Sequence, residues 1–347
     1  MVTPEDSFDE TRLDDAEALA AHDATLRALA EGGARVRREV GLAAEEASRV
    51  RAELGGSRPR AVVAAGPDSR LLRAVLEPWC PVPFVAWPGS GLPGWAGGLD
   101  LVVILAPEGS DRAAASAVVE AGRRGCQVLV VTPTGSMVAE HAQGAGRDVF
   151  VVPATTGDQL ATAVVALGLL HDLTLGPGCD ADLVADALDQ VAVECGPQRD
   201  LVTNPAKELA IALADAVPVV WGGSVLAARA ARRVSEAMRR TTGRSALAGD
   251  AGNLLPVLEG APRRDVFADP YADEQAVARP VLVVLDDGNE APLVREDRGR
   301  LVAAAQAAGV RVETVRHDAG EALASYAALH ATGCWAAEYL ALGRAGD

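Results

Sequence analysis

The feature that most constrains this chain is the alternation of short apolar runs with stretches of helical periodicity. The first runs are RAVVAAG at 60–66, VPFVAW at 82–87 and LDLVVILA at 99–106. The third is apolar on both faces, as expected of a central strand in a parallel sheet. Strands that alternate with helices through short connections form one parallel sheet with helices on both faces. We therefore predict a doubly wound α/β lobe, with further strands at 127–132 and 148–152.

The second half of the chain repeats this plan. Apolar runs at 217–223, 279–287 and 310–315 are predicted strands, and helical stretches separate them. Asn204 precedes Pro205, and this order predicts a capped helix start because the cap accepts from free N–H groups and proline lacks one. A second α/β lobe of similar plan follows.

The length of 347 residues suits two domains, each able to bury its own core. The glycine- and proline-rich segment 175–180 is the predicted boundary. We expect an N-terminal helical segment at 1–57, a first lobe at 58–175 and a second lobe at 176–347. The predicted fold class is α/β, with two doubly wound parallel-sheet lobes behind a helical segment.

Composition excludes several classes of function. The net charge of −16 repels nucleic-acid backbones, and aromatic residues, at 3%, are too few for a base-stacking surface. The longest apolar stretch, Leu160–Leu170, is too short to span a membrane. The five cysteines are spaced for neither zinc nor a disulfide framework, so we expect reduced thiols and, without a leader peptide, a cytoplasmic protein. No nucleotide-binding motif is present, and neither cofactor nor metal is predicted.

In a doubly wound sheet, ligands bind beyond the carboxyl ends of the strands. Three strand-to-helix turns are therefore candidates: 64–70, 106–112 and 221–226. A glycine there lets the backbone approach a ligand, and the following helix offers unpaired N–H groups. For Ser224 an N-cap role is the alternative, and for Lys207 a position on the helix surface. The candidate ligand-binding residues are Gly66, Asp68, Ser69, Gly109, Ser110, Lys207, Gly222, Gly223 and Ser224.

Other polar residues are expected to be structural or solvated. The acidic loop 286–290 lacks the alternating oxygen ligands of a calcium site and is interpreted as a solvated turn. The histidines have no carboxylate or thiol partner at motif spacing, so we assign none of them to catalysis. They are His22, His141, His171, His317 and His330.

The segment NPAKELAIALADAVPVVWGGSVLAARAARR, residues 204–233, resembles the second lobe of bifunctional phosphoglucose/phosphomannose isomerases. The start of the chain and the last helix, 333–344, are similar too, as in divergent actinobacterial members, so the resemblance covers essentially the whole chain. It implies two SIS (sugar isomerase) lobes, a homodimer and a sugar-phosphate ligand. The implied reaction interconverts fructose 6-phosphate with glucose 6-phosphate or mannose 6-phosphate.

The sequence departs from that family at the residues that would hold phosphate. The family has Gly and Ser where this chain has Pro67 and Asp68. Its Ser-x-Ser-Gly-Asn-Thr loop is Ala-Pro-Glu-Gly-Ser-Asp at 106–111, so carboxylates replace two hydroxyls. A carboxylate about 5 Å from a phosphate costs roughly 3 kcal/mol per charge pair, more than a helix dipole returns. Near Gln159 the family's phosphate-binding Arg has no counterpart.

The catalytic residues that the resemblance implies are a Glu, a His and a C-terminal Lys. By spacing, the Glu and His positions fall near Arg240 and Gly252, and no terminal Lys segment occurs before Asp347. Catalytic residues are therefore unknown. Two hypotheses remain open. One is an active aldose–ketose isomerase; the other is a pseudoenzyme that binds a carbohydrate derivative or a protein partner.

Overall fold

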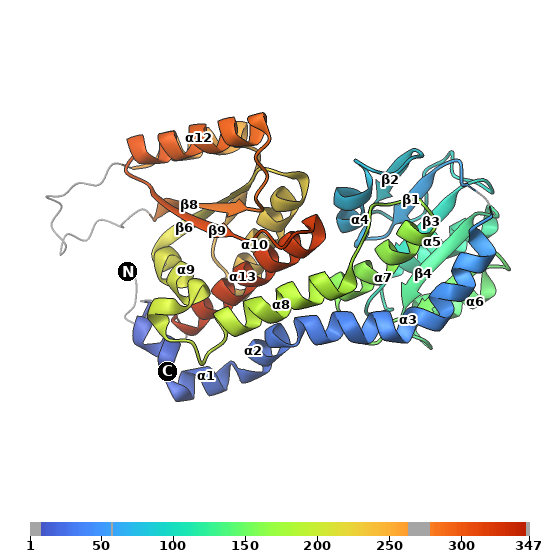
Figure 1. Ribbon diagram of the computed structural model, residues 1–347, viewed down its shortest axis with the longest axis horizontal. Helices are drawn as coiled ribbons and strands as arrows, with labels where there is room; N and C mark the ends of the chain where they lie inside the picture. Colours follow the sequence, from blue (N-terminus) through green and yellow to red (C-terminus); the bar gives the residue numbers. More distant parts are fainter. Residues whose placement is uncertain (1–7, 57, 263–277, 345–347) are drawn as a thin grey trace, which may run out of the picture. The chain divides into compact units, whose positions relative to one another are not determined.

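The computed structural model describes residues 8–56, 58–262 and 278–344 and divides into two compact units (Figure 1). We call Gly32–Ala185 the first lobe. The second lobe joins the N-terminal segment that ends at Glu31 to the chain from Asp186 onward. The N-terminal helices are thus shared between the two lobes, and the later crossing falls within helix α8, Ala181–Cys195.

The first lobe contains a five-stranded parallel sheet in the order β2-β1-β3-β4-β5. Its central strands are buried on both faces, which explains their unbroken Val, Ile and Leu content. The strands are β1 (Val62–Ala65), β2 (Phe84–Trp87), β3 (Leu101–Leu105), β4 (Gln127–Thr132) and β5 (Val149–Pro153).

Helices cover both faces of this sheet. The helices α5 and α6 pack their apolar sides on one face, and α3, α4 and α7 contact the other. The helices are α3 (Gly32–Leu54), α4 (Ser69–Leu76), α5 (Arg112–Arg123), α6 (Met137–Gly144) and α7 (Gln159–Asp172).

The second lobe has a four-stranded parallel sheet in the order β7-β6-β8-β9. Apolar side chains of α11 and α12 pack on one face, and α9, α10 and α13 lie on the other (Figure 1). The strands are β6 (Ala216–Gly222), β7 (Leu247–Ala248), β8 (Arg279–Asp286) and β9 (Arg311–Arg316). The helices are α9 (Pro205–Leu213), α10 (Val225–Thr242), α11 (Ala251–Glu259), α12 (Pro292–Ala307) and α13 (Ala322–Leu342), with a short 3₁₀ helix, η3, at Leu201–Thr203.

The N-terminal elements of the second lobe are η2 (Glu10–Asp14), α1 (Ala16–Ala21) and α2 (Asp23–Ala30). They attach to the end of α13, where the Arg12 guanidinium donates to the carbonyl of Leu342 at 3.1 Å. Helix α13 is apolar all round and buried along most of its length, so it forms the centre of this lobe.

The predicted fold class is confirmed: both sheets are parallel and doubly wound. The predicted cap at Asn204, ahead of Pro205, is confirmed at the start of α9, and Ser224 has the N-cap role at the start of α10. Asp111 caps α5. Strand β7 and helix α11 were not predicted. Among the described residues, no helix has the length and apolarity needed to cross a bilayer.

Candidate functional site

The turns after β1 and β3 lie beside each other at the carboxyl edge of the first sheet. The two strands are neighbours, with Ala65 paired to Ile104. Gly66 has a φ of +87°, and a Cβ there would stand 3.5 Å from that of Ala114 in α5. The structure therefore gathers the candidates from both turns, Gly66, Asp68, Ser69, Gly109 and Ser110, at one edge.

A carboxylate of the chain itself occupies the start of α5. The Asp111 Oδ1 accepts a hydrogen bond from the backbone N–H of Ala114 at 2.7 Å. The hydroxyl of Ser110 and the carboxylate of Glu108 lie exposed on the same turn. A bound phosphate would therefore meet negative charge where a helix N-terminus ordinarily attracts it.

The turn after β1 carries an acceptor and a buried hydroxyl. The Asp68 carboxylate accepts from the side-chain amide of Gln159, at the start of α7. Ser69 is 1% exposed, and its Oγ has no hydrogen-bond partner among the described residues. In this conformation the Oγ is closed off from solvent, so a ligand would reach it only if the turn opened.

Gly109 has a structural role. Its φ is +68°, and a Cβ there would come within 2.2 Å of the Cβ of Ser136, the residue that caps α6. Any larger residue would clash as well as strain the backbone. The glycine is thus explained by the packing of two turns.

Sequence reasoning missed the residue that fixes the turn after β5. Glu39, on α3, is fully buried, and its carboxylate accepts from the backbone N–H groups of Thr155, at 2.7 Å, and Thr156. Arg35, one turn earlier, pairs at 2.8 Å with Asp158, the cap of α7. The helical periodicity of α3 could have shown that position 39 faces inward, but nothing local names its partners.

In the second lobe the chain packs closely around its own glycine turn. A Cβ on Gly222 would come within 2.3 Å of the backbone of Ala227, and one on Gly223 within 2.3 Å of the Val294 side chain. The Ser224 Oγ accepts from the N–H of Ala227 at 2.9 Å and donates to the Asp287 carboxylate. The hydroxyl is therefore engaged within the protein.

The acidic loop after β8 is ion-paired. The Arg298 guanidinium lies 3.1 Å from Asp286 and 3.0 Å from Glu290, and hydrogen bonding to Arg298 lowers the pKa of Glu290. The expected solvated turn is thus a salt-bridged one. Within the described ranges, no group of three or more His, Cys, Asp or Glu side chains could hold a metal ion.

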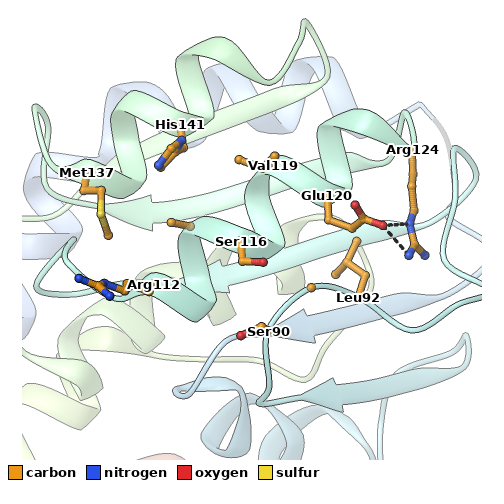
Figure 2. A pocket seen from close by; sticks show the side chains of 11 residues that line it. Ser90, Leu92, Arg112, Ser116, Val119, Glu120, Arg124, Met137 and His141 are labelled. Atoms are coloured by element: carbon orange, nitrogen blue, oxygen red, sulfur yellow. Dashed lines mark hydrogen bonds and ion pairs between the residues drawn. The ribbon is translucent and has the colours of Figure 1, made fainter.

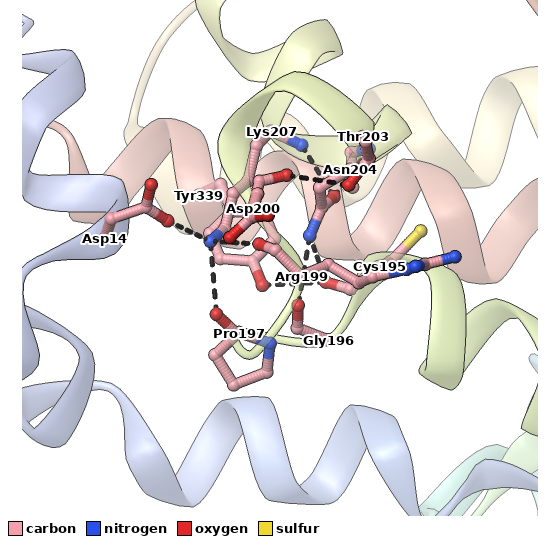
Figure 3. Close-up of polar contacts among 11 residues, drawn as sticks. Asp14, Cys195, Gly196, Pro197, Arg199, Asp200, Thr203, Asn204, Lys207 and Tyr339 are labelled. Carbon is pink, nitrogen blue, oxygen red and sulfur yellow. Dashed lines mark hydrogen bonds and ion pairs between the residues drawn. The ribbon is translucent and has the colours of Figure 1, made fainter.

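Lys207 is fully buried, so the expected helix-surface role is wrong. Its ammonium donates to Asp14 at 2.5 Å and to the carbonyls of Pro197 and Arg199 at 3.2 and 3.0 Å (Figure 3). It also lies 5.5 Å from the centre of the Tyr339 ring. An ammonium has three donors, and all three are used. A ligand contact by Lys207 stays a prediction.

Residues 202–347 match the model of a protein family, the bacterial phosphoglucose isomerase C-terminal SIS domain. The C-terminal part of the chain therefore belongs to the SIS phosphoglucose isomerase family. No curated protein matches the chain in sequence.

Solved structures extend the similarity in fold over most of the chain. Tagatose-6-phosphate ketose/aldose isomerase from Escherichia coli has a TM-score of 0.63 at 13% identity, over 88% of this chain and 91% of that one. The C-terminal domain of glucosamine-fructose-6-phosphate aminotransferase from Francisella tularensis has a TM-score of 0.64 at 12% identity, over 92% and 95%. A glucose-6-phosphate isomerase-like protein from Thermus thermophilus has a TM-score of 0.52 at 18% identity, over 95% and 92%. At these identities the likeness establishes the fold alone.

The histidines of this chain are less isolated than predicted. The His22 Nδ1 lies 2.6 Å from the Glu338 carboxylate, and the His330 Nε2 lies 3.4 Å from the Cys334 thiol, one helical turn away. The structure thus gives these two histidines partners that the sequence did not indicate, and that no histidine is catalytic stays a prediction. The His317 Nε2 lies 2.9 Å from the Thr332 hydroxyl, and burial lowers the pKa of His317.

Each lobe also has a cavity among the described residues. In the second lobe, mainly Ala and Leu side chains of α1 and α2, with Trp335, enclose about 750 Å³. In the first lobe, a groove of about 570 Å³ runs along α5, between α6 and the loop after β2 (Figure 2). Sequence reasoning predicted neither cavity.

Proposed function

We propose that this SIS-fold protein binds a carbohydrate derivative without a phosphate group, at the carboxyl edge of its first sheet, and that it is not an isomerase. One observation carries the proposal: the Asp111 carboxylate already caps the helix start where this fold can take an anion. The second lobe supports the proposal, because the Ser224 hydroxyl donates its hydrogen bond to the Asp287 carboxylate and is thus engaged within the protein.

The groups that remain available suit hydroxyl or amine groups. These are the Glu108 carboxylate and the Ser110 hydroxyl, which are both exposed; the Asp68 carboxylate on the adjacent turn already accepts from the Gln159 amide. Carboxylates only accept hydrogen bonds, and sugar hydroxyls and ammonium groups donate them. A neutral sugar or an amino sugar would satisfy these acceptors, while a phosphate dianion would be repelled by roughly 3 kcal/mol per charge pair at about 5 Å.

The positions assigned by spacing to the family's general acid and base support the loss of chemistry. Arg240 lies exposed on α10, and Gly252 lies on α11. Neither residue is a Glu or a His, the types that the family uses as general base and acid at these positions, and loss of one general acid or base typically costs about 10²–10⁴-fold in rate. We further propose that the protein is cytoplasmic and forms a homodimer. Size-exclusion chromatography with light scattering would test the homodimer.

The test is a thermal-shift titration with glucosamine, mannose, mannose 6-phosphate and fructose 6-phosphate, beside a coupled isomerase assay on fructose 6-phosphate. We expect stabilisation by an unphosphorylated sugar and no turnover. Turnover of fructose 6-phosphate would establish the isomerase hypothesis instead. Stabilisation by the phosphorylated sugars alone would refute the proposed ligand class.

A matched pair of variants sharpens this test. Asp111→Ser keeps a good N-cap residue and removes the charge, and Glu108→Ser removes the second carboxylate. The double variant should gain affinity for mannose 6-phosphate and lose affinity for glucosamine. Asp182→Ser, at the exposed start of α8, is the control for the loss of an acidic residue at a helix N-terminus and should change neither affinity.

A further inference from the structure

The groove of the first lobe is shaped by the outward face of α5. Ala115 and Ser116 form a low floor because their side chains are small, and Val119 and Glu120 continue it along the helix. Met137 and His141 of α6 form one wall, and the loop 90–92 forms the other (Figure 2). The volume of about 570 Å³ lies within the range of small-molecule sites.

One end of the groove carries available positive charge. The side chains of Arg112 and His141 line this end with Met137 (Figure 2). Neither makes a hydrogen bond or ion pair within the described part of the chain, whereas most arginines of this acidic protein are paired. Arginine presents a planar fork of donors that matches a carboxylate or phosphate.

The other end is closed by a neutralised pair. Arg124 contacts Glu120 at 2.6 Å and donates to the carbonyl of Pro93, also at 2.6 Å. Hydrogen bonds from Arg123 and Arg124 lower the pKa of Glu120 to about 2, so this carboxylate stays charged and matched. An anion would therefore gain little binding free energy at this end of the groove and would bind at Arg112 instead.

The middle of the groove is apolar. Leu92 is buried below its rim, Met137 is half-buried, and Val119 is 47% exposed. An isopropyl group left exposed beside a cavity favours an apolar occupant, since covering it removes apolar surface from water.

We infer that this groove binds a small organic anion with an apolar body. The Arg112 guanidinium takes the carboxylate or phosphate, His141 and Ser116 offer further hydrogen-bond partners, and the body lies over Val119 and Leu92. The site borders the turn after β3, because Arg112 directly follows Asp111, but the groove runs away from that turn along α5. Its ligand has the opposite requirement to that of the proposed function, a negative charge and an apolar skeleton.

Methionine methyl groups provide a direct readout. The chain has three methionines; Met137 lines the groove, and Met238, 1% exposed in the second lobe, is an internal control. With isotope-labelled methionine methyl groups, phenylbutyrate added to the full chain should shift the NMR signal of Met137 and leave that of Met238 in place. Phenylbutanol, which has the same skeleton without the charge, should bind about tenfold more weakly.

Variants separate the charge from the fold. Arg112→Gln should weaken phenylbutyrate binding about tenfold, since a charged hydrogen bond is lost, and should leave phenylbutanol binding unchanged. Arg123→Gln, on the same helix but outside the groove, is the matched control and should change binding less than about twofold. Val119→Asp places a carboxylate on the exposed floor and should abolish phenylbutyrate binding.

Three results would overturn the inference. These are an unchanged Met137 signal at about 10 mM phenylbutyrate, equal affinity for the acid and the alcohol, and wild-type affinity in Arg112→Gln. The failure of the sugar titrations would leave this result untouched, because the two tests use different ligands and different residues.

Discussion

In each lobe, a fully buried charged side chain hydrogen-bonds to the backbone of a loop, and the two charges have opposite sign. In the first lobe the Glu39 carboxylate accepts from the N–H groups of Thr155 and Thr156. In the second lobe the Lys207 ammonium donates to the carbonyls of Pro197 and Arg199. The sign of each charge matches the backbone groups that face it. N–H groups need an acceptor, which the carboxylate provides, and carbonyls need a donor, which the ammonium provides.

The two sites differ in whether the buried charge has a partner of opposite charge. Lys207 also pairs with Asp14, whose side chain is 52% exposed and which belongs to the N-terminal segment. Glu39 forms no ion pair within the described residues and is matched only by backbone dipoles. A buried charge is costly unless it is paired and hydrogen-bonded, so the two sites should differ in what they lose when the charge is removed.

The largest effect is expected for Lys207→Met. It removes a hydrogen-bonded ion pair and leaves two carbonyls without donors, so the free energy of unfolding should fall by about 3 kcal/mol. Urea denaturation measures the loss, and hydrogen exchange should rise at 197–207. Glu208→Gln, the exposed neighbour on α9, should change stability by less than about 0.5 kcal/mol. Equal effects of the two variants would show that Lys207 is not the anchor of this segment.

Glu39→Gln should cost less, about 2 kcal/mol. The amide keeps one acceptor oxygen, but its NH₂ group has no acceptor among the N–H groups of the turn. Hydrogen exchange at Thr155 and Thr156 should increase, with the second lobe unaffected. Glu45→Gln, exposed on the same helix, is the control. If Glu39→Gln left exchange at the turn unchanged, the comparison between the two buried charges would fail.

The sequence predicted the fold because the fold depends on local patterns. The apolar run 99–106 alone required a central strand, and Asn204 with Pro205 marked a helix start, as the structure confirms. Helix α11 escaped prediction because Pro256 lies inside it, and β7 because a strand as short as Leu247–Ala248 has no period.

The site could be predicted only in part. The sequence indicated which turns lie at the sheet edges, and the structure gathers those of the first lobe. It did not indicate that Lys207 is buried, because its partner Asp14 lies 193 positions away in the chain. Nor did it indicate Glu39, whose partner Thr155 lies 116 positions away. Contacts at such separations follow from tertiary packing, which periodicity does not report.

The two lobes should also differ in the pH at which acid begins to lower their stability. Burial lowers the pKa of His317 below 6.5, so the stability that depends on its neutral form is complete above pH 6.5 and declines as the pH falls through the folded value. In the first lobe, the pKa of Glu120 falls from 4.5 to about 2, so the contribution of its ion pairs is complete above pH 4.5 and declines only below it. Between pH 6.5 and pH 4.5, therefore, the contribution of His317 declines while that of Glu120 is unchanged.

Urea denaturation at about pH 7 and about pH 5 tests this order. The wild-type midpoint should fall at the lower pH, and His317→Asn, which keeps a polar partner for Thr332, should show a smaller fall. His171→Asn, exposed in the first lobe, should behave like the wild type. A fall of the same size in His317→Asn would assign the acid sensitivity to another group.

The smallest effect is expected for a pair of buried serines. The Ser69 Oγ in the first lobe has no partner, while the Ser235 Oγ in the second lobe, equally buried, donates to the carbonyl of Leu247 at 3.1 Å. Ser69→Ala removes a hydroxyl that has lost its water, so stability should rise by up to about 1 kcal/mol, whereas Ser235→Ala leaves a carbonyl unpaired and should cost about 1 kcal/mol. Thermal unfolding without ligand measures both. If Ser69→Ala is instead destabilising, its hydroxyl has a partner in solution, and the turn after β1 is more open than its packing against α5 indicates.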